Sequence, residues 1–444
     1  MIKKMINKKY QILEITLIFI LTLLFNLICI TINGDEIWNY GFAYNIATGL
    51  IPYKDFNMIV TPLFPMISAI FMKIFGINII TFHIFNTIIC TAIFYYMKKY
   101  IPKAYYIVYA IFLSKSLPNY NIVCMLLMYI LMTMEDKKKN DYLIGIVLGL
   151  TFLTKQNIGI FLCIPTLFTK DIKKISKRIT GFIIPNIIIL IYLLMNKCLY
   201  QFIDYTFLGI ESFTKENIVI YPSCLIVILI CITYLIYKYI KTKDIKILYL
   251  LFFQLMTFPL IEPYHVIIPL IPTIGYFLNT LKLYKKIITF GFIIYIIMIF
   301  STNIYQIHQK EFTYPNETTH FKYRRLPQKN DIAIKNIAKY INSIEDELYI
   351  ISVSAYTLKL EANKTINKYD LLNNGNLGKN GEKEIIKEIE ENCKKNKCVF
   401  LIDVRELNGT AKTQYNKEII KYIETTYWQT GSIGTYNLAI YRNY

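Results

Sequence analysis

The chain has 444 residues, 55% of them apolar, and a formal net charge of +19 at pH 7. Its mean hydropathy is +0.39. A soluble protein of this length is seldom so apolar, whereas a membrane protein with many spans is. The lysines gather in short clusters between apolar segments, with no regular aromatic interleaving. Membrane topology distributes lysines in this way, so nucleic acid is not expected as a partner.

Seven of the nine cysteines lie in or beside apolar segments, where they are expected to pack as small hydrophobic side chains. The other two, Cys393 and Cys398, lie in the polar C-terminal tail. Their spacing allows a disulfide if the tail is outside the cytoplasm, and equally two free thiols. With only four histidines and no four-ligand zinc pattern, no structural metal site is expected.

The first apolar segment, residues 10–32, is long enough to span a membrane. A signal peptide would have a shorter apolar run and a small-residue cleavage site after it. The lysines before the segment place the N-terminus in the cytoplasm, so Gly34, Asp35 and Glu36 emerge on the outer side. Carboxylates this close to lipid are costly unless they are solvated or paired. They therefore anchor a solvated loop or supply a general base at the membrane surface.

The stretch 33–78 is expected to form the first outer loop, with juxtamembrane helices. Its aromatic residues, Trp38 and Tyr40 among them, suit a helix lying in the headgroup layer. Within the loop, segment 61–76 is apolar but short and carries two prolines. If it crossed the membrane, nearly all later lysine clusters would lie outside. We therefore expect a re-entrant or interfacial helix beside a cavity.

Later apolar segments bring the expected number of spans to about eleven. They lie near residues 79–97, 104–117, 120–134, 142–154, 157–169, 179–196, 219–238, 246–260, 264–281 and 286–303. With this parity most lysine clusters are cytoplasmic. Three outer turns then carry polar residues: Leu117-Pro118-Asn119, Lys155-Gln156-Asn157 and Glu262-Pro263-Tyr264-His265.

From about residue 304 the long apolar runs stop, and helical and strand patterns alternate. Helices are expected at 332–344, through Leu358 and Leu360, and at 382–393 and 416–427, with strands at 347–353, 397–404 and 433–442. Asn373-Asn374-Gly375 and Gly378 predict turns. The expected fold is thus a polytopic α-helical membrane protein in residues 1–303, with about eleven spans plus interfacial helices. An extracytoplasmic α/β domain follows in residues 304–444.

Four outer features are candidates for one site. Beside Asp35 and Glu36 they are Lys54 with Asp55, Lys155 with Gln156 and Asn157, and Glu262 with Tyr264 and His265. A lysine beside two amides at a hairpin tip suits a phosphate contact, or is a snorkelling side chain. The histidine could bind phosphate or a sugar hydroxyl, or only satisfy the start of a helix. Lys54 and Lys115 are expected to be plain surface charges.

The order of these motifs resembles the GT-C glycosyltransferase superfamily. The first span is followed at once by Asp35-Glu36, an aromatic stretch, GLIPYKDF and the proline-rich TPLFPMISAIFMKIFG. GLTFLTKQNIGIFL, residues 149–162, is similar to a recurring stretch of that superfamily. Protein O-mannosyltransferases and lipid A aminoarabinose transferases belong to it. The resemblance covers most of residues 10–303.

The resemblance implies that Asp35 is a general base with Glu36 beside it. It implies a sugar donor carried on polyprenyl phosphate, an envelope acceptor, and membrane lipids as surroundings. No cofactor is implied with certainty, and a divalent metal stays open. The chain departs from the family at Val60-Thr61-Pro62-Leu63, where relatives often carry a basic residue or histidine, and at Asn119-Tyr120-Asn121, where many carry an aspartate.

Other classes of protein remain alternatives. A flippase or transporter of lipid-linked sugars would have inverted repeats with matching interrupted helices, which the sequence does not display. A polymerase or ligase of the O-antigen type would favour an outer loop rich in arginine and histidine. A non-catalytic envelope scaffold would leave Asp35 without a purpose.

Overall fold

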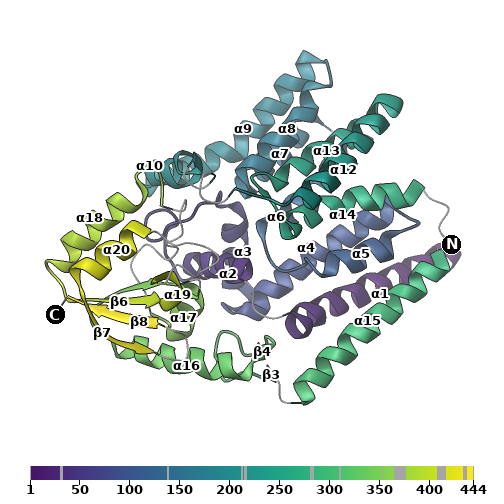
Figure 1. Ribbon diagram of the computed structural model, residues 1–444. Coiled ribbons are helices and arrows are strands. Elements are labelled where there is room, and N and C mark those ends of the chain that lie inside the picture. Colours follow the sequence, from purple (N-terminus) through teal and green to yellow (C-terminus); the bar gives the residue numbers. More distant parts are fainter. Residues whose placement is uncertain are drawn as a thin grey trace. The chain divides into compact units, whose positions relative to one another are not determined.

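The computed structural model describes residues 2–30, 34–137, 140–211, 214, 218–280, 285–309, 312–352, 354–364, 377–407, 417–433 and 438–443 (Figure 1). Four of the described helices are long and apolar enough to cross a membrane. They are Lys9–Cys29, Ile79–Tyr100, Ile172–Met195 and Pro222–Thr242. Several shorter apolar helices accompany them. These helices are compatible with the predicted membrane protein, whose number of spans and orientation stay predictions.

The chain forms two compact units. The first, here called the helical unit, contains Met1–Thr31, Thr61–Leu190 and Ile218–Gln309. The second, the mixed unit, contains Ile32–Val60, Ile191–Asn217 and Lys310–Tyr444. The sequence predicted a domain boundary at residue 303, with residues 33–78 in the membrane domain. In the structure, most of that outer loop packs with the tail.

The helical unit follows the predicted segments closely. Its helices are α1 (Ile2–Leu24) continued by η1 (Phe25–Cys29), α3 (Leu63–Phe75), α4 (Ile79–Tyr100), α5 (Tyr105–Leu113), α6 (Tyr120–Asp136), α7 (Asp141–Thr154), α8 (Gln156–Leu167), α9 (Ile172–Met195), α12 (Pro222–Thr242), α13 (Ile245–Phe253) continued by η3 (Gln254–Thr257), α14 (Pro263–Thr280) and α15 (Lys285–His308). α9 extends into the mixed unit and begins about two turns before the predicted segment, through its basic residues.

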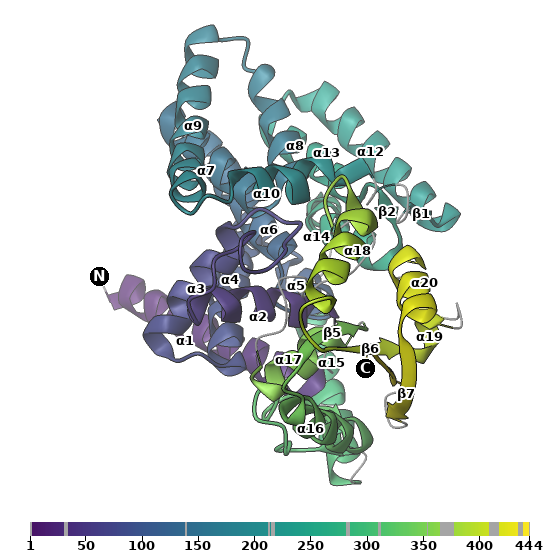
Figure 2. The same ribbon diagram turned by 90° about the vertical axis from the view of Figure 1, so that its left-hand side faces the viewer.

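Local chemistry sets the ends of these helices. The side chains of Asn78, Asn119 and Asn140 accept hydrogen bonds from the first backbone amides of α4, α6 and α7. Gly145 lets α7 approach α9 closely, because a Cβ there would lie 2.1 Å from the carbonyl oxygen of Arg178. In both views α7, α8 and α13 lie side by side (Figures 1 and 2).

A four-stranded sheet forms the core of the mixed unit. Its order is β5 (Glu347–Ile351), β6 (Cys398–Asp403), β8 (Leu438–Arg442), β7 (Trp428–Ile433). β5 and β6 are parallel, and the other two pairs are antiparallel. Alternate residues of β6 point to opposite faces: Phe400 and Ile402 enter one apolar cluster, Val399 and Leu401 the other.

Helices cover both faces of this sheet, giving three layers (Figure 1). On one face lie α18 (Gly381–Cys393) and α20 (Lys417–Thr426). On the other lie α16 (Gln328–Ser343) and α17 (Ala355–Ala362). A short α19 (Val404–Leu407) follows β6, and β3 (Phe312–Thr313) pairs with β4 (Leu326–Pro327).

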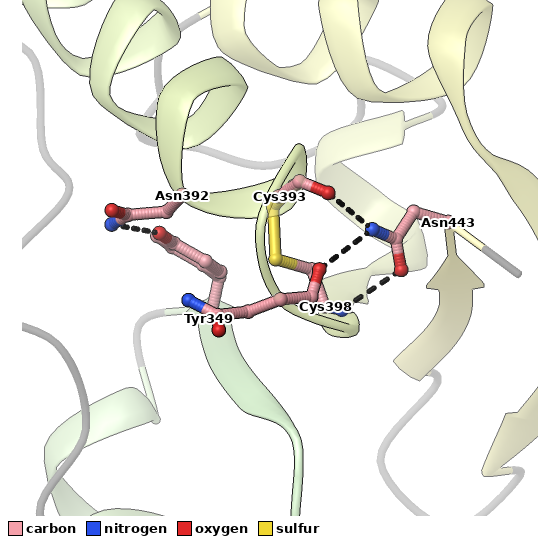
Figure 3. Close-up of a disulfide and its surroundings, with 6 residues drawn as sticks. Tyr349, Asn392, Cys393, Cys398 and Asn443 are labelled. Atoms are coloured by element: carbon pink, nitrogen blue, oxygen red, sulfur yellow. Dashed lines mark hydrogen bonds between the residues drawn. A yellow bond between two sulfur atoms is a disulfide. The ribbon is translucent and has the colours of Figure 1, made fainter.

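The predicted elements of the tail are confirmed at α16, α17, α18, α20, β5, β6 and β8. The prediction missed the two-residue strands β3 and β4 and also β7, an edge strand whose Trp428 is 76% exposed and which has no buried alternation. The predicted turn at 373–375 lies outside the described residues. Cys393 and Cys398 form a disulfide between the end of α18 and the start of β6, and the Asn443 side chain bonds to both backbones (Figure 3).

Candidate functional site

The residues predicted to form one site are divided between the two units, which are described in turn. Asp35, Glu36, Lys54 and Asp55 belong to the mixed unit. The Lys155 and Glu262 turns belong to the helical unit. Different surrounding residues therefore hold the side chains of each group.

The first outer loop begins with α2 (Gly34–Ala47), which packs directly on the tail. A Cβ at Gly41 would lie 2.4 Å from the ring of Tyr356 in α17, so only glycine allows this approach. The Tyr40 hydroxyl lies 3.2 Å from Nδ1 of His320, and the Tyr44 ring meets the same imidazole edge-on, with centroids 5.2 Å apart. Burial lowers the pKa of His320. These contacts hold α2 as part of the mixed unit.

Glu36 forms a fully buried ion pair. Its Oε2 accepts a hydrogen bond of 2.7 Å from Nη2 of Arg324, and both side chains have no exposed surface. Burial lowers the pKa of Arg324, while the carboxylate opposes this shift. A buried pair of this kind ties α2 to the β3–β4 loop. Glu36 was predicted beside the base as a catalytic residue, and the structure shows its carboxylate fully buried and paired with Arg324.

Asp35 differs from its neighbour. It lies in the first turn of α2 and is only partly buried. Its backbone oxygen accepts a hydrogen bond of 2.7 Å from the Asn39 side chain, which braces that turn. A carboxylate in the first turn also complements the helix dipole, the structural alternative to a catalytic role.

Lys54 and Asp55 lie in a tight turn after α2. The Asp55 carboxylate accepts a hydrogen bond of 2.7 Å from the Ile51 amide, so it serves its own turn. Tyr53 has φ of 69° and donates through its buried hydroxyl to the carbonyl of Val60, 2.7 Å away. Lys54 is exposed, as expected for a surface charge.

In the helical unit, a rigid loop joins α5 to α6; we call residues 114–121 the hairpin loop. Buried polar side chains fix it from two other helices. The Ser116 hydroxyl donates to Oδ1 of Asn26 at 2.7 Å, and the Ser116 carbonyl accepts from Asn86 at 2.6 Å. All three residues are fully buried. Because buried polar groups are costly unless bonded, these pairs specify one loop conformation.

Lys155 reaches this loop from the break between α7 and α8. Its ammonium donates to Oδ1 of Asn121 at 3.0 Å and lies 4.9 Å from the ring centroid of Tyr120. Asn157 accepts from the Ile158 amide at 2.9 Å, so its carbonyl serves the start of α8. Gln156 opens the same helix and is partly buried. From this predicted trio, Lys155 contacts the hairpin loop.

The Glu262 turn approaches the same loop from its other end. Pairing of β1 (Val219–Ile220) with β2 (Leu260–Ile261) precedes α14 and holds this turn. The Glu262 carboxylate lies 2.9 Å from Nδ1 of His265, as expected for a satisfied helix start. The ammonium of Lys115 lies over the Tyr264 ring, 4.6 Å from the ring centroid. Thus two turns that are far apart in sequence meet the hairpin loop.

Two residues with a part in these sites were not predicted as such. The sequence predicted Lys115 to be a plain surface charge, although it lies at a hairpin tip as Lys155 does. Arg324 lies in the polar tail, and its pairing with Glu36 spans 288 residues, so no local pattern indicates it. The described residues contain no group of three or more His, Cys, Asp or Glu side chains that could hold a metal ion.

No family model, curated protein or solved structure matches this chain. The resemblance to GT-C glycosyltransferases stays a prediction from the residues. The arrangement offers one partly buried carboxylate on a braced helix in the mixed unit. In the helical unit it offers lysines held over tyrosine rings at a rigid loop, which suits binding of an anion.

Proposed function

We propose that the protein is an integral-membrane glycosyltransferase of the GT-C type. It transfers a sugar from a polyprenyl-phosphate donor to an acceptor outside the cytoplasm, which is a cell-envelope glycan, lipid or protein. The proposal includes about eleven spans, a cytoplasmic N-terminus and an extracytoplasmic tail. The Cys393–Cys398 disulfide supports the placement of the tail, since disulfides persist in oxidising compartments.

The observation that carries the proposal is the contrast between Asp35 and Glu36. Both follow the first long apolar helix, yet one is locked in a buried ion pair and the other is partly accessible. A loop anchor would need only one solvated carboxylate. A general base needs a carboxylate on a support that cannot move, and the buried pair supplies that support.

The donor class follows from the side of the membrane. Nucleotide sugars are confined to the cytoplasm, while the proposed base lies outside. A donor used there must be activated already and carried across. A sugar on polyprenyl phosphate has a good leaving group, and its isoprenoid chain lies in the bilayer.

The proposed step is a single displacement. The Asp35 carboxylate accepts the proton of the acceptor hydroxyl or amine as that group attacks the anomeric carbon. The bond from the anomeric carbon to the phosphate oxygen breaks, and polyprenyl phosphate leaves with its electron pair. Lys155 and His265 stabilise the negative charge on the departing phosphate.

The test uses purified protein and a panel of polyprenyl-phosphate sugars, with sugar transfer and donor hydrolysis as readouts. One donor should be consumed by the wild type. D35N should keep the wild-type unfolding temperature but lose about 10²–10⁴-fold in rate. E345Q, an exposed carboxylate of the same unit, is the control and should behave like wild type. Retention of more than a tenth of the rate by D35N would contradict a general base.

A further inference from the structure

The ammonium of Lys115 is placed unlike those of three other cations of the helical unit that are at least partly buried. It lies over the Tyr264 ring, and among the described residues no hydrogen bond or ion pair is found for it. By contrast, Lys98 pairs with Glu14, Lys246 with Asp136, and Arg178 with Glu135. The fold thus supplies carboxylates for those cations and an aromatic face for Lys115.

A partly buried ammonium without a counter-charge is held at a cost unless something offsets the loss of hydration. A cation–π contact offsets only a part of this cost. An anionic ligand would offset the remainder, and a phosphate provides both charge and acceptor oxygens.

The position of Lys115 is fixed before any ligand binds. Its neighbour Ser116 is fully buried and bonded to Asn26 and Asn86. At the other end of the hairpin loop Asn119 caps α6, and Asn121 accepts from Lys155. Lys115 within the hairpin loop and Lys155 beside it each lie over a tyrosine ring. Such preorganisation lowers the entropy lost when a ligand binds.

We propose that Lys115, seated on Tyr264, binds the phosphate group of a lipid phosphate, with Lys155 as the second cation at the same hairpin loop. The occupant is the phosphate end of a polyprenyl-phosphate carrier, and this identity rests on the proposed function. A tyrosine-backed ammonium favours a phosphate over a neutral headgroup by its charge. The alternative without a ligand is a lysine that only snorkels at the membrane surface.

The experiment measures binding without transfer. Full-length protein in detergent is titrated with farnesyl phosphate, farnesol, inorganic phosphate and phosphatidic acid, and the unfolding temperature gives the affinity. The variants are K115Q, K115R and K103Q. Lys103 is exposed and precedes α5 at the opposite end from Lys115, which makes it the matched control.

Farnesyl phosphate should stabilise the wild type and K103Q, while farnesol and inorganic phosphate should not reach the same affinity. K115Q should lose about tenfold or more in affinity, the value of one charge-assisted hydrogen bond, and K115R should retain part of it. Equal affinity of K115Q and wild type would overturn the proposal. Equal, Lys115-dependent binding of phosphatidic acid would assign the site to bilayer lipids and overturn the carrier as occupant.

Failure of this site and failure of the transferase proposal give different results. If sugar transfer is found and K115Q leaves KM and kcat unchanged, the phosphate site is wrong and the transferase stands. If farnesyl phosphate binds through Lys115 and no polyprenyl-phosphate sugar is consumed, the site stands and the transferase fails. D35N should bind farnesyl phosphate as the wild type does, because Asp35 acts on the acceptor.

Discussion

The two ends of α6 treat positive charge in opposite ways. At its C-terminal end Glu135 accepts from Arg178 at 2.7 Å and from the Tyr249 hydroxyl at 2.9 Å, and Asp136 lies 2.6 Å from the Lys246 ammonium. At its N-terminal end Lys155 meets the Asn121 amide and the Tyr120 ring, and Lys115 lies over the Tyr264 ring of α14. One end therefore matches its cations with carboxylates, and the other holds Lys115 beside an uncharged partner.

This difference separates two uses of a cation. A cation matched by a buried carboxylate contributes to stability, because removing it leaves an uncompensated negative charge. A cation without a counter-charge contributes nothing comparable to stability and is held at a cost. The second arrangement is the one expected where a ligand supplies the missing charge.

The largest loss is expected for R178Q. Arg178 is 3% exposed and bonds to both Glu135 and Asp141, so its removal leaves two carboxylates without their cation. The expected destabilisation is about 3–5 kcal/mol. Thermal and denaturant unfolding in detergent measure it, with the exposed neighbour K177Q as control. An unfolding temperature equal to that of K177Q would show that this end is not held by matched charges.

The same rule predicts a comparable loss of stability in the mixed unit for R324M, which leaves the buried Glu36 carboxylate without its counter-charge. The expected cost is again about 3–5 kcal/mol, whereas the double variant E36L/R324M should recover most of it. The coupling energy from the four proteins is the measurement. Additive effects of the two substitutions would mean that the pair does not tie α2 to the tail.

K246Q should cost much less, at most about 1 kcal/mol, although it too breaks ion pairs. The side chain of Lys246 is 27% exposed, so water screens its pairs with Asp136 and Asp244. The loss of stability caused by K246Q should become smaller at higher salt concentration. Unfolding measurements at low and high ionic strength check this. A salt-independent loss would indicate a buried pair like that of Arg178.

K115Q should leave the unfolding temperature unchanged or raise it slightly, the opposite sign to R178Q. The substitution removes a charge held at a cost and retains a polar side chain that reaches the same surface. K115M, which removes all polarity, should behave alike. A loss of stability in both would assign Lys115 a structural role and weaken the contrast between the two ends.

Local sequence patterns predicted most of the helices and three strands of the central sheet. Runs with helical or alternating periodicity gave α16, α18 and β6 within a few residues, because side-chain burial repeats with the local backbone geometry. The hairpin tips at Asn119 and Lys155 were also visible, since helix caps and breaks are local. The edge strand β7 has no such pattern and was missed.

Tertiary structure alone decided which residues meet. Residues 34–60 belong to the same unit as the tail, and within it Glu36 pairs with an arginine 288 residues away. Lys115 became a binding candidate only when α14 placed a tyrosine ring under it. A sequence displays charge and periodicity, but the partner that decides whether a charge stabilises the fold or awaits a ligand comes from a distant segment.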